Sequence, residues 1–544
     1  MRLHPLALAA SAAILALSNP AQAQQPSAVS ETALRAHLSF LADDLLEGRG
    51  TGQRGGELAV RYLETQAALI GLQPIPGTNG SYRQKVDIEG SKLLSGSVTF
   101  SAGGKTFKPE FGKEIVFGTK SGNENVAFDA PLVFVGYGAA APEENWDDYK
   151  GLDAKGKILV MMVDDPQPTL DEPNRFAGKA YTWYGRWVYK FEEAARRGAA
   201  GVLLIHTTPS ASYPWSVPAN GFANERFGLK GNGNPMEGWL HEDTARALFA
   251  AGGHDLDTLR AQAERRDFRP VDLKVAAHAE LRSQIRAVEQ FNVIGIVPGS
   301  DAKLKSQAVI YSSHWDHMGM IEGGGQDGKD RIYNGAIDNA SGTAALLAMA
   351  QQAVKNPARR TQIFLWPAAE EQGLLGAAAY VAKPVWPLAQ TAADLNLDSL
   401  NFAGRTRDIG VAGAERSSLY ETSAKVAKSM GLKLAPHVPD MSGAYFRADH
   451  FAFAKAGVPA FNVGSAVFSG DGHFEFEHHQ DEQSATVKGF TKHYHQVSDE
   501  YKPEWDLSGM VQQAQFTLNL GYAVANDPKM PTWKKGEAFG SVKR

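Results

Sequence analysis

Two adjacent carboxylates at the end of an apolar run constrain this chain more than any other feature. Residues 363–366 read Ile-Phe-Leu-Trp, and Pro-Ala-Ala then leads to Glu370 and Glu371. Such a run predicts a buried strand whose carboxyl end delivers both charges into a cleft. Adjacent residues leaving a strand point in opposite directions, so one carboxylate can bind a cation while its neighbour reaches a water molecule. Without a cation, burying both would be costly and one would protonate.

The first residues of the chain predict export. Arg2 is followed by an apolar core at residues 6–17 and by Ala-Gln-Ala at residues 21–23. This three-part pattern is typical of a secretory signal peptide cleaved after residue 23. The apolar core is too short for a permanent membrane anchor, and no later stretch is apolar for long enough. We therefore expect an exported protein, periplasmic or secreted, without a membrane anchor.

Composition excludes several classes of partner and site. The formal net charge is −5, and the chain contains no cysteine. So small a charge does not indicate nucleic acid or an anionic membrane as a partner. Without cysteine there are no disulfides and no thiolate zinc sites. The 544 residues suffice for two or more domains with buried cores.

The pattern of apolar residues divides the chain into a host and an insert. Residues 24–125 open a host domain with helices expected near 34–41 and 55–69, separated by a flexible glycine-rich turn at 48–52. Residues 126–285 contain short strands and one helix, which predict a small inserted α/β module. Residues 286–526 resume the host domain, and residues 527–544 form a polar tail. An aromatic-rich stretch at 181–189 either shapes a substrate pocket or packs the module against the host.

Strands and helices alternate through residues 286–526, which predicts an α/β fold with a mostly parallel sheet between two layers of helices. In such a fold the active site lies beyond the carboxyl ends of the strands. Five segment ends there carry groups able to bind a metal. They are His314 with Asp316, Asp338, Glu370 with Glu371, Asp398, and His495.

Each of these groups alone has a plainer interpretation. His314 could be a hydrogen-bonded core histidine, Asp338 a helix N-cap, and Asp398 a turn residue. Glu370 and its neighbour could form a solvated first helical turn, and His495 could lie on the surface. Five such groups rarely meet by chance at one edge of a sheet. Imidazole and carboxylate together are ligands of catalytic zinc, and one shared carboxylate can hold two cations roughly 3.5–4 Å apart.

The ordered motifs of the chain resemble metallopeptidase family twenty-eight, the two-zinc exopeptidases of the bacterial leucyl aminopeptidase and glutamate carboxypeptidase type. The motifs are Ser-His-Trp-Asp-His at 313–317, Asn-Gly-Ala-Ile-Asp-Asn-Ala-Ser-Gly at 334–342, Glu-Glu-Gln-Gly-Leu-Leu-Gly at 370–376, Leu-Asp at 397–398 and Tyr-His at 494–495. Residues 41–52 look like the opening segment of bacterial members, and the module looks like their inserted protease-associated domain. The resemblance covers nearly the whole mature chain and implies the zinc-exopeptidase, phosphorylase/hydrolase-like fold.

The resemblance also implies a ligand set for two zinc ions per chain. Asp338 would be the carboxylate that bridges both ions. His314 and Asp398 would complete one site, and Glu371 and His495 the other.

The same resemblance implies the catalytic groups of peptide-bond hydrolysis. Glu370 would be the general base for a zinc-activated water and would later protonate the departing amine. Asp316 would orient the imidazole of His314. Tyr494, or alternatively Tyr445, would donate a hydrogen bond to the developing oxyanion.

The sequence leaves alternatives for which end of the peptide is trimmed and for which reaction is catalysed. A carboxypeptidase needs arginines near the substrate carboxylate; Arg447 is a candidate, but one arginine leaves an aminopeptidase favoured. Glutaminyl cyclases share the fold with a single zinc, whereas His314 and Asp316 alongside Asp398 favour two metals. Some relatives bind partners without a metal site, but here every ligand position is filled. Side-chain preference, peptide length and oligomeric state are not determined by the sequence.

Overall fold

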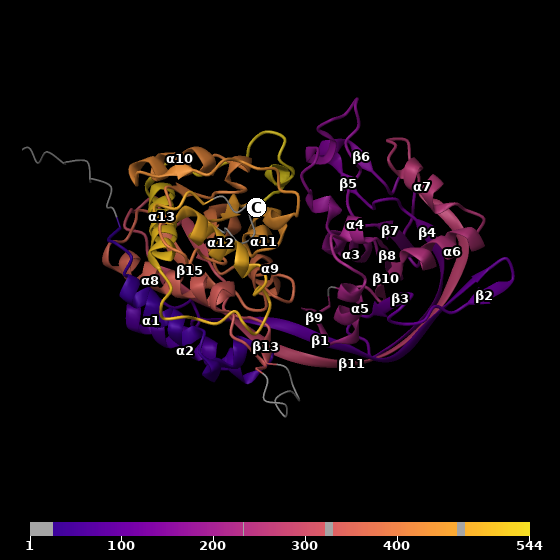
Figure 1. Ribbon diagram of the computed structural model, residues 1–544, viewed down its shortest axis with the longest axis horizontal. Helices are drawn as coiled ribbons and strands as arrows, with labels where there is room; N and C mark the ends of the chain where they lie inside the picture. The colour runs from indigo at the N-terminus through magenta and orange to yellow at the C-terminus, as the bar shows by residue number, and fades with distance from the viewer. Residues whose placement is uncertain (1–25, 232, 321–329, 465–473) are drawn as a thin grey trace, which may run out of the picture.

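The computed structural model describes residues 26–231, 233–320, 330–464 and 474–544, and it shows two bodies joined by a pair of long strands (Figure 1). The strands β1 (Arg83–Ala102) and β11 (Val271–Val297) run antiparallel and extend from one body into the other. The predicted signal peptide, residues 1–23, lies outside the described residues.

The host sheet places the carboxyl ends of its parallel strands at one edge. Its order is β19-β16-β12-β15-β11, with the first four strands parallel and β11 antiparallel to both β15 and β1. The bounds of the parallel strands are Ala460–Asn462 for β19, Thr391–Asn396 for β16, Ala308–Ser312 for β12 and Thr361–Trp366 for β15. The predicted mostly parallel mixed sheet is thereby confirmed.

Helices cover both faces of this sheet, as predicted. On one face lie α1 (Glu31–Leu41), α2 (Arg54–Ile70), α8 (Ser341–Lys355) and α13 (Ser508–Asn526); on the other lie α9 (Leu375–Ala382) and α11 (His450–Lys455). Alternate side chains of one strand enter opposite cores: in β15, Phe364 packs in the first and Ile363 in the second. Because both faces are buried, the strands read as continuous apolar runs.

The second body is an α/β module with its own cores. Strands β4, β7, β8 and β10 are parallel, and β3 lies antiparallel at the edge. Their bounds are Asn125–Phe134 for β4, Ile158–Met162 for β7, Gly201–His206 for β8, Glu237–His241 for β10 and Ile115–Gly118 for β3. Helices α3 (Trp187–Arg196), α6 (Glu242–Ala251) and α7 (Leu256–Ala263) complete the module, and α3 faces the host.

The core of the module begins earlier in the chain than the predicted boundary at residue 126. Val98 and Phe117 already pack with Leu281 in that core. Since β1 and β11 pass without interruption from one body to the other, the sequence carries no loop or change of composition at the junction.

Two segments that looked unstructured are packed on the host. The predicted flexible turn at 48–52 overlaps a short 3₁₀ helix, Asp44–Arg49, and the side chain of Arg49 is fully buried. The polar tail lies against the host: the indole N–H of Trp533 donates to the carbonyl of Gly457 at 2.7 Å, and Phe539 is buried in the larger core.

Within the described ranges, no helix combines the length and the apolar character that crossing a membrane requires.

We expect Phe539→Ala to lower the free energy of unfolding by about 3 kcal/mol, because a large buried side chain leaves a cavity when truncated. The ring of Phe539 packs edge-on against the ring of Phe451, and the two centroids are 5.7 Å apart. Its centroid also lies 5.7 Å from that of Trp533. Urea unfolding followed by circular dichroism measures the change. Lys543→Ala, at an exposed position of the same segment, should change it by less than about 0.5 kcal/mol. If both substitutions lowered the free energy of unfolding by equally small amounts, the result would contradict the packing of the tail on the host.

Candidate metal centre

The predicted ligands come from five segments that meet at the carboxyl edge of the host sheet. His314 follows β12, Glu370 and Glu371 follow β15, and Asp398 follows β16. Asp338 lies in the irregular turn Ala336–Ala340 that leads into α8. His495 follows helix α12 (Gln480–Phe490). The parallel arrangement of the strands therefore brings residues distant in sequence to one place.

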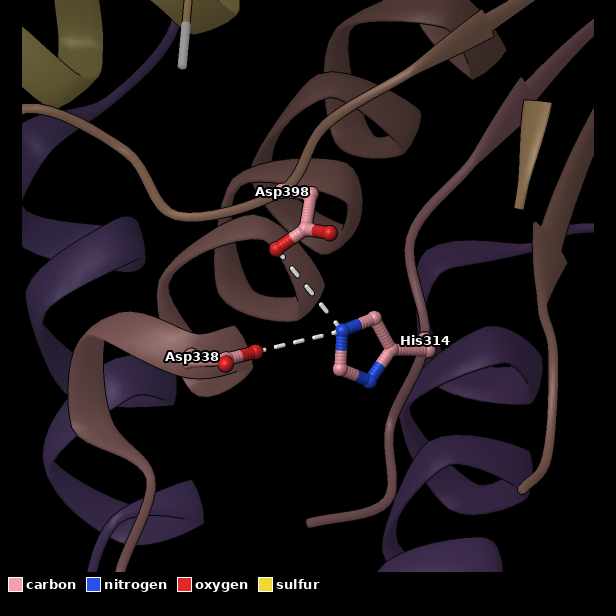
Figure 2. Close-up of side chains that lie close together, drawn as sticks. All are labelled: His314, Asp338 and Asp398. Carbon is pink, nitrogen blue, oxygen red and sulfur yellow. Dashed lines mark ion pairs between the residues drawn. The ribbon is translucent and has the colours of Figure 1, made fainter. Parts of the chain in front are cut away.

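The first cluster consists of His314, Asp338 and Asp398, all buried (Figure 2). His314 Nε2 lies 3.3 Å from Asp338 Oδ1 and 3.7 Å from Asp398 Oδ1. Its other ring nitrogen, Nδ1, lies 3.1 Å from the carbonyl oxygen of Asp316, which orients Nε2 toward the two carboxylates. Nε2 is buried and has no hydrogen-bond partner among the residues that the structure describes. Three donor atoms thus converge as in a metal site.

The second cluster uses the other oxygen of the same aspartate. His495 Nε2 lies 3.3 Å from Asp338 Oδ2 and 3.0 Å from Glu371 Oε2. This nitrogen is also buried, and no described residue hydrogen-bonds to it. The two oxygens of Asp338 therefore face different histidines, as expected for a carboxylate between two cations.

His317 also belongs to the centre, although sequence analysis assigned it no role. Its Nδ1 lies 2.6 Å from Glu371 Oε1. A ring nitrogen of His317 and carboxylate oxygens of Asp338 and Glu371 lie close enough together to hold one metal ion. Carboxylates that bind metals are commonly held by such a hydrogen bond. The signal was present, because His317 is the second histidine of the Ser-His-Trp-Asp-His motif.

The surroundings of the two adjacent glutamates shift their pKa values in opposite directions. Burial, together with the nearby charges of Glu371 and Asp398, raises the pKa of Glu370 well above its usual range, although His314 opposes the shift. Burial and Asp338 also act to raise the pKa of Glu371, but His495 and His317 outweigh them and lower it to about 2. The surroundings thus favour the ionised form of Glu371 and the protonated form of Glu370.

The bridging aspartate is held ionised by its neighbours. Burial alone would raise its pKa, but the imidazoles of His314 and His495 keep the pKa of Asp338 well below the usual value. Behind it, the carboxylate of Asp499 accepts from the amides of Ile337 at 3.0 Å and of Asp338 at 3.1 Å. Asp499 therefore fixes the backbone that carries the bridging carboxylate.

Arg49 holds together two of the loops that carry ligands. Its buried guanidinium donates to the carbonyl oxygens of Trp315 at 2.8 Å, Asn334 at 2.6 Å, Gly335 at 2.9 Å and Leu41 at 2.5 Å. Sequence analysis missed this role, because a single arginine between glycines carries no signal for contacts almost three hundred residues away.

The predicted catalytic residues lie beside the ligands. Glu370 Oε2 is 3.9 Å from His314 Nε2. The carboxylate of Asp316 accepts from the amide of Glu370 at 3.0 Å, so it positions that glutamate, while its distance to His314 Nδ1 is 3.8 Å. Tyr494 stacks on the ring of His495, with centroids 3.8 Å apart.

The two candidate substrate-binding residues differ in position. The hydroxyl of Tyr445 donates to the carbonyl of Ala460 at 2.9 Å, and its buried ring does not line the cavity at the centre. This corrects the prediction that Tyr445 contacts substrate, because its phenolic hydroxyl donates inside the fold. Arg447, in contrast, is exposed and lines the cavity.

The cavity has a volume of about 970 Å³ and lies between the two bodies. One wall contains Asp338, Glu370 and Tyr494 of the host. The module contributes aromatic side chains, including Trp183 and Trp187, to the other wall. Trp183 also packs against Phe451 of the host, with ring centroids 4.6 Å apart and the rings tilted by 57°, so the aromatic-rich stretch both packs against the host and shapes the cavity.

Comparison with known proteins agrees with this geometry. Residues 292–518 match the model of peptidase family M28. This part of the chain is therefore similar to peptidase family M28. Family M28 is the family that the motifs resemble, and its matched range includes every predicted ligand.

The curated relatives that this chain matches are named aminopeptidases. A probable leucine aminopeptidase of Arthroderma otae is 29% identical over 192 residues, covering 33% of this chain and 47% of the relative. Leucine aminopeptidase 1 of Ajellomyces dermatitidis is 28% identical over 250 residues, covering 43% of this chain and 56% of the relative. The chain thus spans about half the length of the curated relatives it matches.

Among solved structures, the aminopeptidase from Aneurinibacillus sp. strain AM-1 is 18% identical with a TM-score of 0.49, and the match covers 92% of this chain and 95% of that one. BSAP, a zinc aminopeptidase from Bacillus subtilis, is 17% identical with a TM-score of 0.43, and the match covers 95% of this chain and 98% of that one.

We expect Arg49→Met to lower the free energy of unfolding by about 3 kcal/mol or more, because four carbonyl oxygens lose their donor. Metal affinity should fall as well, since the loops carrying His314 and Asp338 lose their common support. Thermal unfolding and zinc titration of the metal-free protein measure both effects. Arg54→Met, at an exposed position five residues later, should leave both nearly unchanged. Unchanged metal affinity in Arg49→Met would contradict the supporting role.

Proposed function

We propose that this chain is an exported zinc-dependent aminopeptidase that removes amino-terminal residues from peptides. The observation that carries the proposal is a pair of ligand clusters sharing Asp338, with Glu370 beside them, in a cavity large enough for a peptide. The match of residues 292–518 to a peptidase family and the names of the curated relatives support it. The pattern of residues 1–23 supports export to the periplasm or the medium.

The donor set fits two zinc ions. Imidazole nitrogen and carboxylate oxygen are the donors that catalytic zinc prefers, and the buried Nε2 atoms of His314 and His495 have no other partner among the described residues. His314 and Asp398 would hold one ion, Glu371 and His495 the other, and Asp338 both. When bound, zinc would supply a Lewis acid that polarises the peptide carbonyl and makes water acidic near neutral pH.

Glu370 would serve as the general base and acid. It would accept a proton from the attacking water and return it to the nitrogen of the departing amine. Asp316 would keep the glutamate in place through the backbone amide of Glu370.

Tyr494 would stabilise charge that develops on the substrate carbonyl oxygen. Burial, with Asp338 and Glu371 nearby, raises the pKa of its phenol well above the usual value, so the hydroxyl keeps its proton. A protonated hydroxyl at the wall of the cavity is a suitable donor to an oxyanion.

We expect Glu370→Gln to lower kcat for leucine 4-nitroanilide by about 10²–10⁴-fold, because general acid–base catalysis contributes that much. Metal content should not change, since Glu370 is not a ligand in this scheme. Steady-state kinetics and elemental analysis of the same preparation measure the two quantities. Glu504→Gln, at an exposed position, is the matched control and should retain wild-type kinetics. Full activity in Glu370→Gln would refute the assigned base.

Substitution of the ligands should distinguish one metal from two. Wild-type protein is expected to contain two zinc ions per chain, Asp398→Ala about one and Asp338→Ala almost none, because only Asp338 contacts both clusters. Chelation should abolish anilide hydrolysis, and zinc should restore it. A single zinc in the wild type, without anilide hydrolysis, would favour a glutaminyl cyclase. A protein that binds no metal would instead be a non-catalytic binding protein.

A further inference from the structure

Two arginines from different bodies line the cavity beside the metal centre. Arg186 belongs to the module and Arg447 to the host, and both line the same cavity as Asp338 and Glu370. We propose that Arg186, Arg447 and the amino-terminal end of α3 form a subsite for a carboxylate of the peptide substrate. The proposal rests on the proposed function and specifies the class of peptide that the site prefers.

Arg186 is half-buried, and one of its donor atoms has no partner in the described part of the chain. Its Nε is buried and has no hydrogen-bond partner in the described part of the chain, and no ion pair joins its guanidinium to a described carboxylate. Burial lowers its pKa to about 10, and the like charge of Arg447 acts in the same direction. Two neighbouring cations of this kind favour an anion between them.

Arg447 leaves most of its donors available to a ligand. Its Nη2 donates to the carbonyl of Ser442 at 2.9 Å, and its side chain is exposed at the cavity wall. The nearby Asp440 does not neutralise the pair by an ion pair. Its carboxylate instead accepts from the backbone amides of Ala444 at 2.9 Å and Tyr445 at 2.9 Å.

The helix that follows Arg186 adds a second attraction for an anion. Arg186 is the N-cap residue of α3, and no side chain caps that end of the helix. Trp187 and Val188, the first residues of α3, line the cavity together with Arg186. The amino-terminal end of a helix carries partial positive charge and free amide donors, so an anion beside Arg186 would be stabilised by both.

The charges along the cavity match the polarity of a short peptide. The metal centre, rich in carboxylates, would face the free amine and the scissile bond, and the arginines would face a carboxylate further along the chain. At about 970 Å³ the cavity is at the upper end of typical ligand sites, which are roughly 300–1,000 Å³. The carboxylate could come from the carboxyl terminus of a short peptide or from an Asp or Glu side chain.

The test compares four substrates: Leu-Gly-Gly, Leu-Gly-Gly-amide, Leu-Gly-Asp-amide and leucine 4-nitroanilide. Arg186→Met should raise KM for Leu-Gly-Gly by roughly 10- to 100-fold, because hydrogen bonds to charged groups are worth that much, and should leave its kcat nearly unchanged. Hydrolysis of the anilide, which has no carboxylate, should not change. Arg186→Lys should restore part of the loss.

The two amides identify the source of the carboxylate. If the subsite binds the carboxyl terminus, both amides should have a high KM in the wild type and should not respond to Arg186→Met. If it binds an acidic side chain, Leu-Gly-Asp-amide should have a low KM that Arg186→Met raises. Either pattern supports the subsite.

Controls separate this proposal from the proposed function. Arg265→Met, at an exposed position of the module, should leave all four substrates unaffected. Arg447→Met, also exposed, should reproduce the effect of Arg186→Met even if the latter does not fold. An equal change for all four substrates, or no change for any of them, would overturn the subsite. A wild-type protein inactive toward all four would overturn the proposed function itself.

Discussion

The contact of one carboxylate with two histidines is the interaction on which the rest of the site depends. Asp338 presents one oxygen to His314 and the other to His495, so the two clusters form a single centre. Such an arrangement concentrates negative charge in a buried place, which is unfavourable without cations. The two imidazoles keep the pKa of Asp338 well below its usual value.

Keeping this centre in place requires support from segments far from it in sequence. Arg49 ties together the loops after β12 and before α8, and Asp499 holds the amides of the turn that carries Asp338. Asp316 binds the amide of Glu370 and so connects the loops after β12 and β15. Each contact satisfies a backbone group that would otherwise be buried without a partner. The ligands are thus rigidly positioned before any metal binds.

The inserted module changes what the centre can accept. Through β1 and β11 it is continuous with the host sheet. On its other side it contacts the host through the tilted rings of Trp183 and Phe451 and through an ion pair of Glu192 with Lys455 at 2.7 Å. The metal centre therefore lies in a cavity between two bodies. One wall supplies the chemistry, and the other supplies aromatic and cationic side chains that a peptide would meet beyond the scissile bond.

The sequence by itself determined the α/β class and most of the centre, because apolar runs of strand length end in ionisable residues and the carboxyl ends of parallel strands share one edge. Local patterns of this kind need no knowledge of distant contacts. Only the tertiary structure decided that Arg49 is buried beneath the ligand loops, that His317 holds Glu371, and that Tyr445 turns its hydroxyl into the fold. It also decided where the module begins. Those features depend on which segments pack together, and packing between residues hundreds of positions apart leaves no periodic signal in a single chain.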